Sequence, residues 1–295
     1  MTSISVVIPA YNRANLLERT LESVARQSYK PYEVIIVDDQ SPDKTQEVVV
    51  QLTEKYKDRL DIIYILHEKN KGEAGSRNTG IQKARGDYVA FLDSDDEWLP
   101  EKLEKQVQYL EKNKVDGVFC ESFLVDQGDY ERAVLTTIDH DTILPEKLLT
   151  KGCGYGTGTN LLISRDVILN QPFDESLRLF VDVDWLYRVS QQANIKVMHE
   201  GLAYYHKAPM RSGAYVEEHA IIFLNKYKAL LDTWPWHKRQ QVISYMEWNI
   251  AFGYQGNQEY YRAAYHFLRG ILIWPLRNPK YYLFVPINII KGLSR

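Results

Sequence analysis

Hydrophobic and polar residues alternate with two different periods along the first third of the chain. Residues 15–27 and 43–56 repeat their apolar side chains with the spacing of amphipathic helices. Four short, β-branched segments bounded by turn residues have the pattern of strands: 4–10, 33–38, 61–66 and 87–93. Strands that are apolar on both faces and alternate with helices predict an α/β fold, with a mostly parallel sheet that helices cover on each face.

The remainder of the chain is less regular and ends in helices. The pattern predicts four further segments, namely a strand over 116–125, a polar connection over 126–133, a Gly-rich loop leading into a strand over 151–168, and a helix over 180–194. Beyond Gly213 the sequence becomes helical and rich in aromatic residues. We therefore expect one domain over residues 1–214 and a small helical region over residues 215–295.

Composition excludes several classes of protein. The formal net charge of −3 gives no sign of a nucleic-acid surface. Cys120 and Cys153 lie far apart without metal-ligand spacing, which suits a reducing cytosol. The N-terminus lacks the basic region of a signal peptide, and no segment approaches the roughly 18–20 apolar residues of a membrane span. We expect a cytoplasmic protein that is neither secreted nor membrane-spanning.

Polar clusters follow three of the predicted strands, at residues 9–13, 38–43 and 93–96. In open parallel sheets, ligands bind beyond the carboxyl ends of the strands. One such cluster is usually a helix cap, whereas three along one edge of a sheet predict a binding site.

The last of these clusters belongs to a run of four carboxylates, Asp93, Asp95, Asp96 and Glu97. Asp93 and Asp95 are an alternating pair that points to one side of an extended segment. Mg²⁺ and Mn²⁺ are commonly held by one or two such carboxylates together with substrate phosphates. The alternative is that Ser94 or Asp95 caps a following helix, whose positive N-terminus favours the other acids. The two interpretations can hold together.

The preceding segment, residues 70–93, favours a phosphate ligand. Gly72 and Gly75 allow close approach of the backbone, and Arg77 and Asn78 are expected at the start of a helix that ends at Gly86. A helix start with a nearby guanidinium suits a diphosphate. The alternative is an Arg on the surface of an amphipathic helix.

These segments together resemble the inverting family 2 glycosyltransferases, which use nucleotide sugars and have the GT-A fold. The resemblance covers residues 3 to about 213 and leaves the helical tail outside. The matching stretches, in the order of the family, are SVVIPAYNR, EVIIVDDQSPD, NKGEAGSRNTGIQKARGDYVAFLDSDDEWLP, GTNLLISRDVI with FDESL, and VDVDWLYRV.

The resemblance implies roles for individual residues. Asp39 would accept from the imide of the base, which we expect to be uracil, and Asp38 would support that loop. Asp95, and secondarily Asp93, would bind Mn²⁺ or Mg²⁺ at the diphosphate. The implied nucleotide-binding residues are Pro9, Ala10, Tyr11, Asp38, Asp39, Arg77 and Ser94.

On the acceptor side, the family usually has a Glu-Asp pair whose Asp is the general base. Here the pair is Val181 and Asp182, so Asp182 is the implied base. Asp184 is the alternative, and on a helix it would lie about 200° round from Asp182. Residues His206, Arg211 and Ser212 would close over the diphosphate as a loop. The Gly-rich stretch 152–158 is interpreted as a mobile acceptor-side loop, or else as an ordinary connection.

The expected activity is the metal-dependent, inverting transfer of a hexosyl or N-acetylhexosaminyl group in cell-surface polysaccharide synthesis. The partners would be a nucleotide-sugar donor and a glycan or lipid-linked acceptor. Sugar nucleotidyltransferases are one alternative, but they need a Gly-rich, Arg-containing loop where this chain has PAYNRAN. A non-catalytic nucleotide-sugar binder is another. The tail is expected to contact the inner face of the cell membrane or a partner, or to pack on the catalytic domain.

Overall fold

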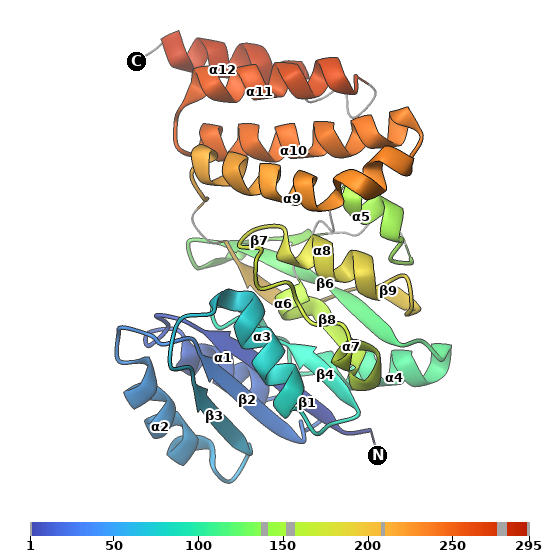
Figure 1. Cartoon of the computed structure of the whole chain (residues 1–295). Coiled ribbons are helices and arrows are strands. Elements are labelled where there is room, and N and C mark those ends of the chain that lie inside the picture. The colour runs from blue at the N-terminus through green and yellow to red at the C-terminus, as the bar shows by residue number, and fades with distance from the viewer. Residues whose placement is uncertain (1, 137–140, 152–156, 208–209, 276–281, 294–295) are drawn as a thin grey trace. The chain divides into compact units, whose positions relative to one another are not determined.

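The protein is a mixed α/β structure followed by a series of helices (Figure 1). The computed structural model describes residues 2–136, 141–151, 157–207, 210–275 and 282–293. The strands of its sheet are β1 (Ile4–Ala10), β2 (Glu33–Asp38), β3 (Ile62–Leu66), β4 (Tyr88–Phe91), β5 (Glu97–Trp98), β6 (Gly117–Asp126), β7 (Asp129–Thr136), β8 (Leu161–Ser164) and β9 (Ile195–His206).

Helices surround the sheet in the first part of the chain and make up the last part. In the sheet region they are α1 (Leu17–Ala25), α2 (Thr45–Tyr56), α3 (Gly72–Lys83), α4 (Lys102–Asn113), α6 (Thr157–Asn160), α7 (Arg165–Leu169) and α8 (Val181–Val189). The others are α5 (Pro145–Lys151), α9 (Gly213–Thr233), α10 (Trp236–Gly256), α11 (Tyr260–Ile273) and α12 (Phe284–Leu293).

Contacts between residues divide the chain into two units. The first contains residues 1–145, 154–176 and 184–207, and the second contains 146–153, 177–183 and 208–295. Helix α8 therefore begins in the second unit and ends in the first. The simple boundary near residue 214 stays a prediction.

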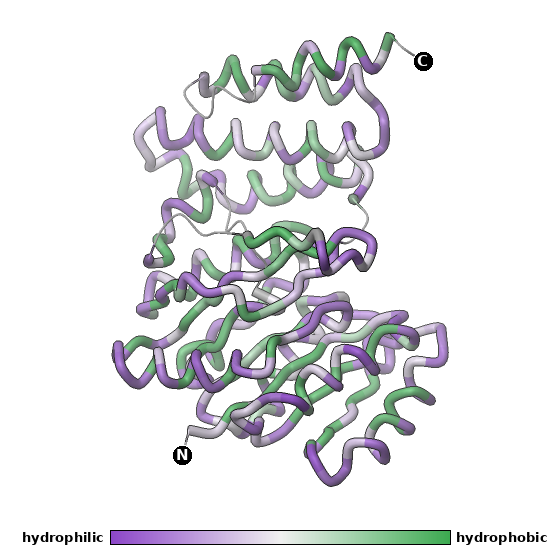
Figure 2. The backbone as a smooth tube through the Cα atoms, turned by 180° about the vertical axis from the view of Figure 1, so that it is seen from behind, coloured by the Kyte–Doolittle hydropathy of each residue, from purple (hydrophilic) through white to green (hydrophobic). Residues whose placement is uncertain are grey.

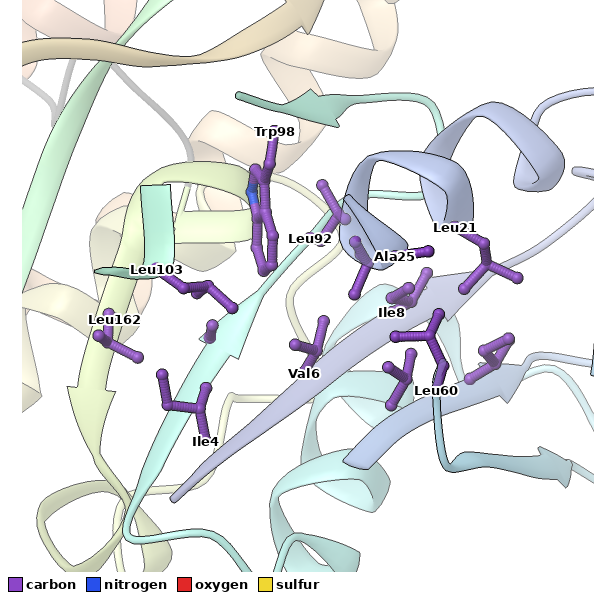
Figure 3. Packing of buried hydrophobic residues seen from close by; sticks show 14 of the residues in the cluster. Ile4, Val6, Ile8, Leu21, Ala25, Leu60, Leu92, Trp98, Leu103 and Leu162 are labelled. Carbon is purple, nitrogen blue, oxygen red and sulfur yellow. The ribbon is translucent and has the colours of Figure 1, made fainter. Parts of the chain in front are cut away.

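The parallel half of the sheet forms as its hydrophobic pattern predicts. Strands β3, β2, β1 and β4 are parallel neighbours, and every residue of β1 is buried. Ile4, Val6 and Ile8 belong to one hydrophobic cluster with Leu21 of α1 and Leu103 of α4 (Figure 3). Burying a β-branched or leucine side chain in such a cluster contributes about 1.5–3 kcal/mol.

The opposite face of β1 is covered by α3 at very close range. A Cβ atom at Gly80 would lie 2.3 Å from Cγ1 of Val7, so only glycine lets the helix approach the strand this far. This contact fixes the height of α3 above the sheet, and with it the position of every polar side chain that α3 carries.

The other half of the sheet differs from the expected parallel pattern. The full order is β3-β2-β1-β4-β8-β6-β9-β5, and β8 runs antiparallel to both β4 and β6. The prediction of a polar connection over 126–133 was wrong, because β7 pairs with β6 from Asp129 onward. This strand pairs with β6, and its sequence DYERAVLT does not alternate polar and apolar residues, so no strand pattern marks it.

The helices of the second unit contact one another in chain order, α9 with α10, α10 with α11 and α11 with α12. A buried carboxylate joins two of them: Glu247 Oε2 of α10 lies 2.7 Å from His266 Nδ1, and Glu247 Oε1 lies 3.2 Å from Arg269, both on α11. Ser244 Oγ also donates to the carbonyl of Gly270 over 2.9 Å. Among the described residues, no helix is long and apolar enough to cross a membrane.

Candidate active site

The carboxyl ends of three neighbouring strands form the edge at which the polar clusters lie. β1 pairs in parallel with β2 on one side and with β4 on the other. Because parallel strands end at the same edge, the loops after Ala10, Asp38 and Phe91 come together there. A direct bond joins the first two loops, since Asn12 N–H donates to Ser41 Oγ over 2.9 Å.

Asp38 is buried and organises the loop after β2. Its carboxylate accepts from Ser41 N–H over 2.8 Å and from the Tyr64 hydroxyl over 2.7 Å. Burial, together with this bond to the carboxylate, raises the pKa of Tyr64. Asp38 therefore supports the loop that follows it.

Asp39 is also buried and is bonded mainly to the segment that begins α3. It lies 2.7 Å from His67 Nδ1 and accepts from the backbone N–H groups of Lys71 and Gly72 over 2.8 and 2.7 Å. A carboxylate can accept about four hydrogen bonds, so these three leave room for one more. Asp39 thus has a structural role at the start of α3, in addition to whatever it contributes to a ligand.

The acidic run does not cap a helix, so that interpretation was wrong. Asp93 to Asp96 form a turn after β4, Glu97 and Trp98 form β5, and α4 begins only at Lys102. The carboxylates therefore receive no stabilisation from the N-terminal dipole of α4, which decays within the first turn. Other partners must compensate their charges.

Asp93 is paired with an arginine of α3. Arg77 lies 3.0 Å from Asp93 Oδ1 and 2.5 Å from Glu73 Oε1, and its guanidinium stands 5.4 Å from the centre of the Phe173 ring. The helix begins at Gly72, five residues before Arg77, so the expectation that Arg77 starts it was wrong. A Cβ at Gly158 would lie 2.1 Å from the Asp93 carboxylate, so the backbone of α6 closes over this residue.

Asp95 has a second arginine as its partner. Arg13, from the loop after β1, lies 3.4 Å from Asp95 Oδ2, and the side chains are 35% and 26% exposed. Arg19 of α1 also holds this turn, because its guanidinium donates to the backbone carbonyl of Asp95 over 2.5 Å. The Asp95 carboxylate therefore keeps access to solvent while its backbone is fixed.

Asp96 is the buried member of the group. It accepts from the backbone N–H of His206 over 2.8 Å and is hydrogen-bonded to the hydroxyl of Thr159. Burial raises the pKa of Asp96 well above its usual value, and the nearby charges of Asp93 and then Asp95 raise it further. Asp96 thus ties the turn to the ends of β9 and α6.

Glu97 completes the set. It lies 2.8 Å from Nε2 of His206 and 3.3 Å from Arg19 Nε, and it accepts from the Tyr130 hydroxyl. Burial and this bond raise the pKa of Tyr130 to about 12. The carboxylate holds His206, the first residue of the predicted diphosphate loop, by its imidazole, while Asp96 holds it by its backbone.

The donor set fits a divalent cation that also binds phosphate, rather than one held by protein alone. Two carboxylates, Asp93 and Asp95, stand partly open at the turn, and carboxylate oxygens suit Mg²⁺ and Mn²⁺. Within the described part of the chain, no group of three or more His, Cys, Asp or Glu side chains could hold a metal ion. A nucleotide would have to supply the remaining ligands.

Other residues singled out in the sequence have the following positions. Pro9 and Ala10 end β1, Tyr11 beside them is exposed, and Ser94 is buried with its carbonyl bonded to Thr20. Asp182 is the second residue of α8. Ser212 caps α9 by accepting from Tyr215 N–H over 3.3 Å, and the Arg211 guanidinium lies over the Tyr215 ring, 5.7 Å from its centre. Residues 152–156 of the Gly-rich stretch lie outside the described residues.

Several residues of the site were not among the sequence candidates; they include Arg13, Arg19, Tyr130 and Thr159. Arg13 belongs to the cluster after the first strand and was visible as part of it. Thr159 carries no signal, because its bond to Asp96 joins residues 63 positions apart. Only the folded sheet brings them together.

The family model for "Glycosyl transferase family 2" matches residues 5–170, which is more than half of the chain and includes the whole acidic turn. The chain belongs to glycosyl transferase family 2. A similar relative is the amylovoran biosynthesis glycosyltransferase AmsB of Erwinia amylovora, 30% identical over 278 residues, 90% of this chain and 89% of that one.

A second relative in this family is the UDP-Glc:alpha-D-GlcNAc-diphosphoundecaprenol beta-1,3-glucosyltransferase WfgD of Escherichia coli. It is 33% identical over 174 residues, which are 58% of this chain and 62% of that one.

Two solved structures share the fold of this family 2 member. S. aureus TarS in complex with UDP has a TM-score of 0.63 at 19% identity and covers 99% of this chain and 88% of its own. The mannosyltransferase PcManGT of Pyrobaculum calidifontis, in complex with GDP-Man and Mn²⁺, has a TM-score of 0.59 at 17% identity and covers 99% and 86%. The expected GT-A type fold is confirmed.

Replacing Asp96 separates its structural role from its charge. Asp96→Ala leaves the His206 N–H and the Thr159 hydroxyl without their partner, so we expect the free energy of unfolding to fall by about 1–3 kcal/mol. Asp96→Asn can accept from His206 and donate to Thr159, so it should remain close to wild type. Urea unfolding of both variants measures this, and equal stability of the two would contradict the role assigned to Asp96.

Proposed function

We propose that the protein is an inverting, metal-dependent glycosyltransferase that uses a UDP-sugar and acts in cell-surface polysaccharide synthesis. The acceptor would be a hydroxyl of a glycan or of a lipid-linked sugar. The observation that carries this proposal is the pair of partly open carboxylates, Asp93 and Asp95, in a rigid turn at the carboxyl ends of β1 and β4. The names of AmsB and WfgD, which refer to amylovoran and to a diphosphoundecaprenol acceptor, support the class of product.

Asp95, and secondarily Asp93, would hold Mn²⁺ or Mg²⁺ together with the diphosphate of the donor. When bound, such an ion stabilises the negative charge of the leaving nucleoside diphosphate as a Lewis acid. Arg77 contributes a fixed positive charge on the same side, since it is already bonded to Asp93. Together these groups would favour departure of the nucleoside diphosphate.

The nucleotide would lie against the ends of β1 and β2. Pro9, Ala10 and the exposed Tyr11 would contact the base and ribose. Asp39 would accept the imide N–H of uracil through the capacity that its three bonds leave, and such a charge-assisted bond contributes about 1.5–3 kcal/mol. We therefore propose uridine as the base, with Asp38 and Ser94 shaping the pocket around it.

Asp182 is the proposed general base, ahead of Asp184. Asp184 is buried and paired with Arg188 of the next turn of α8 at 2.8 Å, so its carboxylate is already committed. Asp182 is partly exposed at the start of the same helix, where a carboxylate can meet an acceptor hydroxyl. One in-line displacement assisted by this base inverts the anomeric configuration, and no covalent intermediate forms.

His206, Arg211 and Ser212 are proposed to belong to a loop that covers the diphosphate. His206 is held by Glu97 and Asp96, so the loop starts from a fixed residue. Arg211 supplies a positive charge suited to phosphate. The loop would exclude water from the donor and limit its hydrolysis.

The exposed face of α11 and α12 is proposed to bind the surface of an anionic membrane. Leu272 and Leu293 are each 73% exposed, and hydrophobic residues recur along both helices (Figure 2). Residues 260–295 contain six Lys and Arg but no Asp or Glu, although the whole chain has a net charge of −3. An apolar face flanked by basic residues suits anionic lipid headgroups and would bring the enzyme to a lipid-linked acceptor.

Asp95→Asn should abolish the Mn²⁺ dependence of UDP binding, because an amide oxygen is a weaker ligand than a carboxylate. Calorimetric titration of UDP with and without Mn²⁺ measures this. Asp126→Asn, at an exposed carboxylate whose ion pair among the described residues is with Lys207, is the matched control and should behave as wild type. Unchanged Mn²⁺ dependence in the Asp95 variant would refute the metal assignment, and GDP binding as tightly as UDP would refute uridine.

Asp182→Asn should reduce sugar transfer by roughly 10²–10⁴-fold, the usual contribution of a positioned general base. Binding of UDP and Mn²⁺ should stay normal, because this carboxylate has neither role. Transfer rates and the anomeric configuration of the product, read by NMR, test the mechanism. Full activity of the variant would show that the general base is a residue other than Asp182. No transfer by the wild-type enzyme would favour a non-catalytic binder, which Val181 in place of the usual Glu keeps open.

Leu272→Glu combined with Leu293→Glu should release the protein from vesicles that contain anionic lipid, since each change places a negative charge at the lipid surface. Co-sedimentation with anionic and with neutral vesicles measures this. Ile221→Glu, at another exposed apolar position on α9, is the control and should bind as wild type. If the wild-type protein does not co-sediment with anionic vesicles, the membrane proposal is wrong.

A further inference from the structure

The two carboxylates at the centre of the acidic turn are each neutralised by one arginine, but the two arginines are held in different ways. Arg77 lies 3.0 Å from Asp93, and Arg13 lies 3.4 Å from Asp95. Both carboxylates therefore already have a positively charged partner without any ion, and a divalent cation that binds there adds charge that something must balance.

Arg77 is a permanent partner. Its side chain is 1% exposed, it contacts the carboxylates of Glu73 and Asp93, and it stands over the Phe173 ring. Moving it would leave a buried guanidinium without its partners, which costs several kcal/mol. Asp93 keeps this arginine whatever else binds at the turn.

Arg13 has a fixed backbone and a loosely held side chain. Its N–H donates to Thr45 Oγ1 over 3.0 Å, and its carbonyl accepts from Leu16 and Leu17 at the start of α1. Its guanidinium, by contrast, is 35% exposed and is held by two long contacts of 3.4 Å, one to Asp95 Oδ2 and one to the carbonyl of Asn12. Exposed pairs of this kind contribute only about 0.2–1 kcal/mol. The side chain can therefore turn while the loop stays in place.

We propose that Arg13 is an exchangeable counter-ion: it neutralises Asp95 in the metal-free protein and pairs with the donor diphosphate once a divalent cation occupies Asp95. This inference rests on the proposed function. A cation at Asp95 would repel the Arg13 guanidinium and would be coordinated by the carboxylate oxygens of Asp95. A phosphate oxygen that shared the ion with Asp95 would be a new partner for the Arg13 guanidinium, because arginine binds phosphate through a fixed fork of donors.

The exchange couples the two ligands. The cation alone must displace Arg13 and leave it without an anion, so metal binding without donor is weakened. When the diphosphate is present, the displaced guanidinium gains a partner and both ligands bind more tightly. By linkage, whatever factor the donor adds to metal affinity, the metal adds to donor affinity.

Arg13→Gln should change the affinities for the two ligands in opposite directions. Binding of Mn²⁺ alone should tighten by about two- to five-fold, the size of an exposed ion pair. Binding of UDP at saturating Mn²⁺ should weaken by about ten-fold or more, because a charge-assisted bond to phosphate is lost. Uridine, which has no diphosphate, should bind as it does to wild type. Titration of full-length protein, with Mn²⁺ followed by its magnetic resonance signal, gives all three values.

Arg26→Gln is the matched control, because Arg26 at the end of α1 is an exposed arginine whose ion pair within the described residues is with Glu22, and all three affinities should stay at wild-type values. Arg13→Lys should fall between wild type and Arg13→Gln for UDP. Both affinities falling together in Arg13→Gln would indicate a merely structural residue and overturn the inference, as would no change in either. Wild-type protein that binds neither Mn²⁺ nor UDP would instead overturn the proposed function.

Discussion

Electrostatic repulsion among four neighbouring carboxylates is the constraint on which the site depends. Asp93, Asp95, Asp96 and Glu97 are held together in one turn, which is tolerable only because each has its own compensation. Arg77 is paired with Asp93, and Arg13 is paired with Asp95. Asp96 is buried, its pKa is raised, and it accepts two hydrogen bonds. Glu97 is paired with His206 and Arg19. The strand order matters to function because it delivers these partners to one edge of the sheet.

The parallel half of the fold could be predicted from the sequence because its signals are local. The strands from Ile4, Glu33, Ile62 and Tyr88 are apolar on both faces and separated by helical periods, so pattern and structure agree. The remaining strands of the sheet could not be predicted in this way. β5 has two residues, too few to show any period, and β7 mixes polar and apolar residues without a regular alternation. The antiparallel placement of β8 depends on pairing with β6, which no local pattern encodes.

The candidate site, too, could be predicted from the sequence only where its signals are local. The acids after β4 and the arginine of α3 were visible because they stand in short motifs of the family. Their geometry was not, because the bonds that organise them join distant positions, such as Asp96 to His206 across 110 residues. Sequence alone could not distinguish Arg77, buried and fixed, from Arg13, whose guanidinium is held by two long contacts of 3.4 Å. Because of that difference, we propose Arg77 as a permanent counter-ion and Arg13 as an exchangeable one.

A crystal structure of the chain with UDP and Mg²⁺ tests the central claim most directly, because it shows where the charges of the turn are balanced when the donor is present. We expect the ion about 2.1 Å from a carboxylate oxygen of Asp95. The diphosphate should complete its coordination, and Arg77 should still be bonded to Asp93. UDP bound at the ends of β1 and β2 with the ion coordinated away from the acidic turn would contradict it.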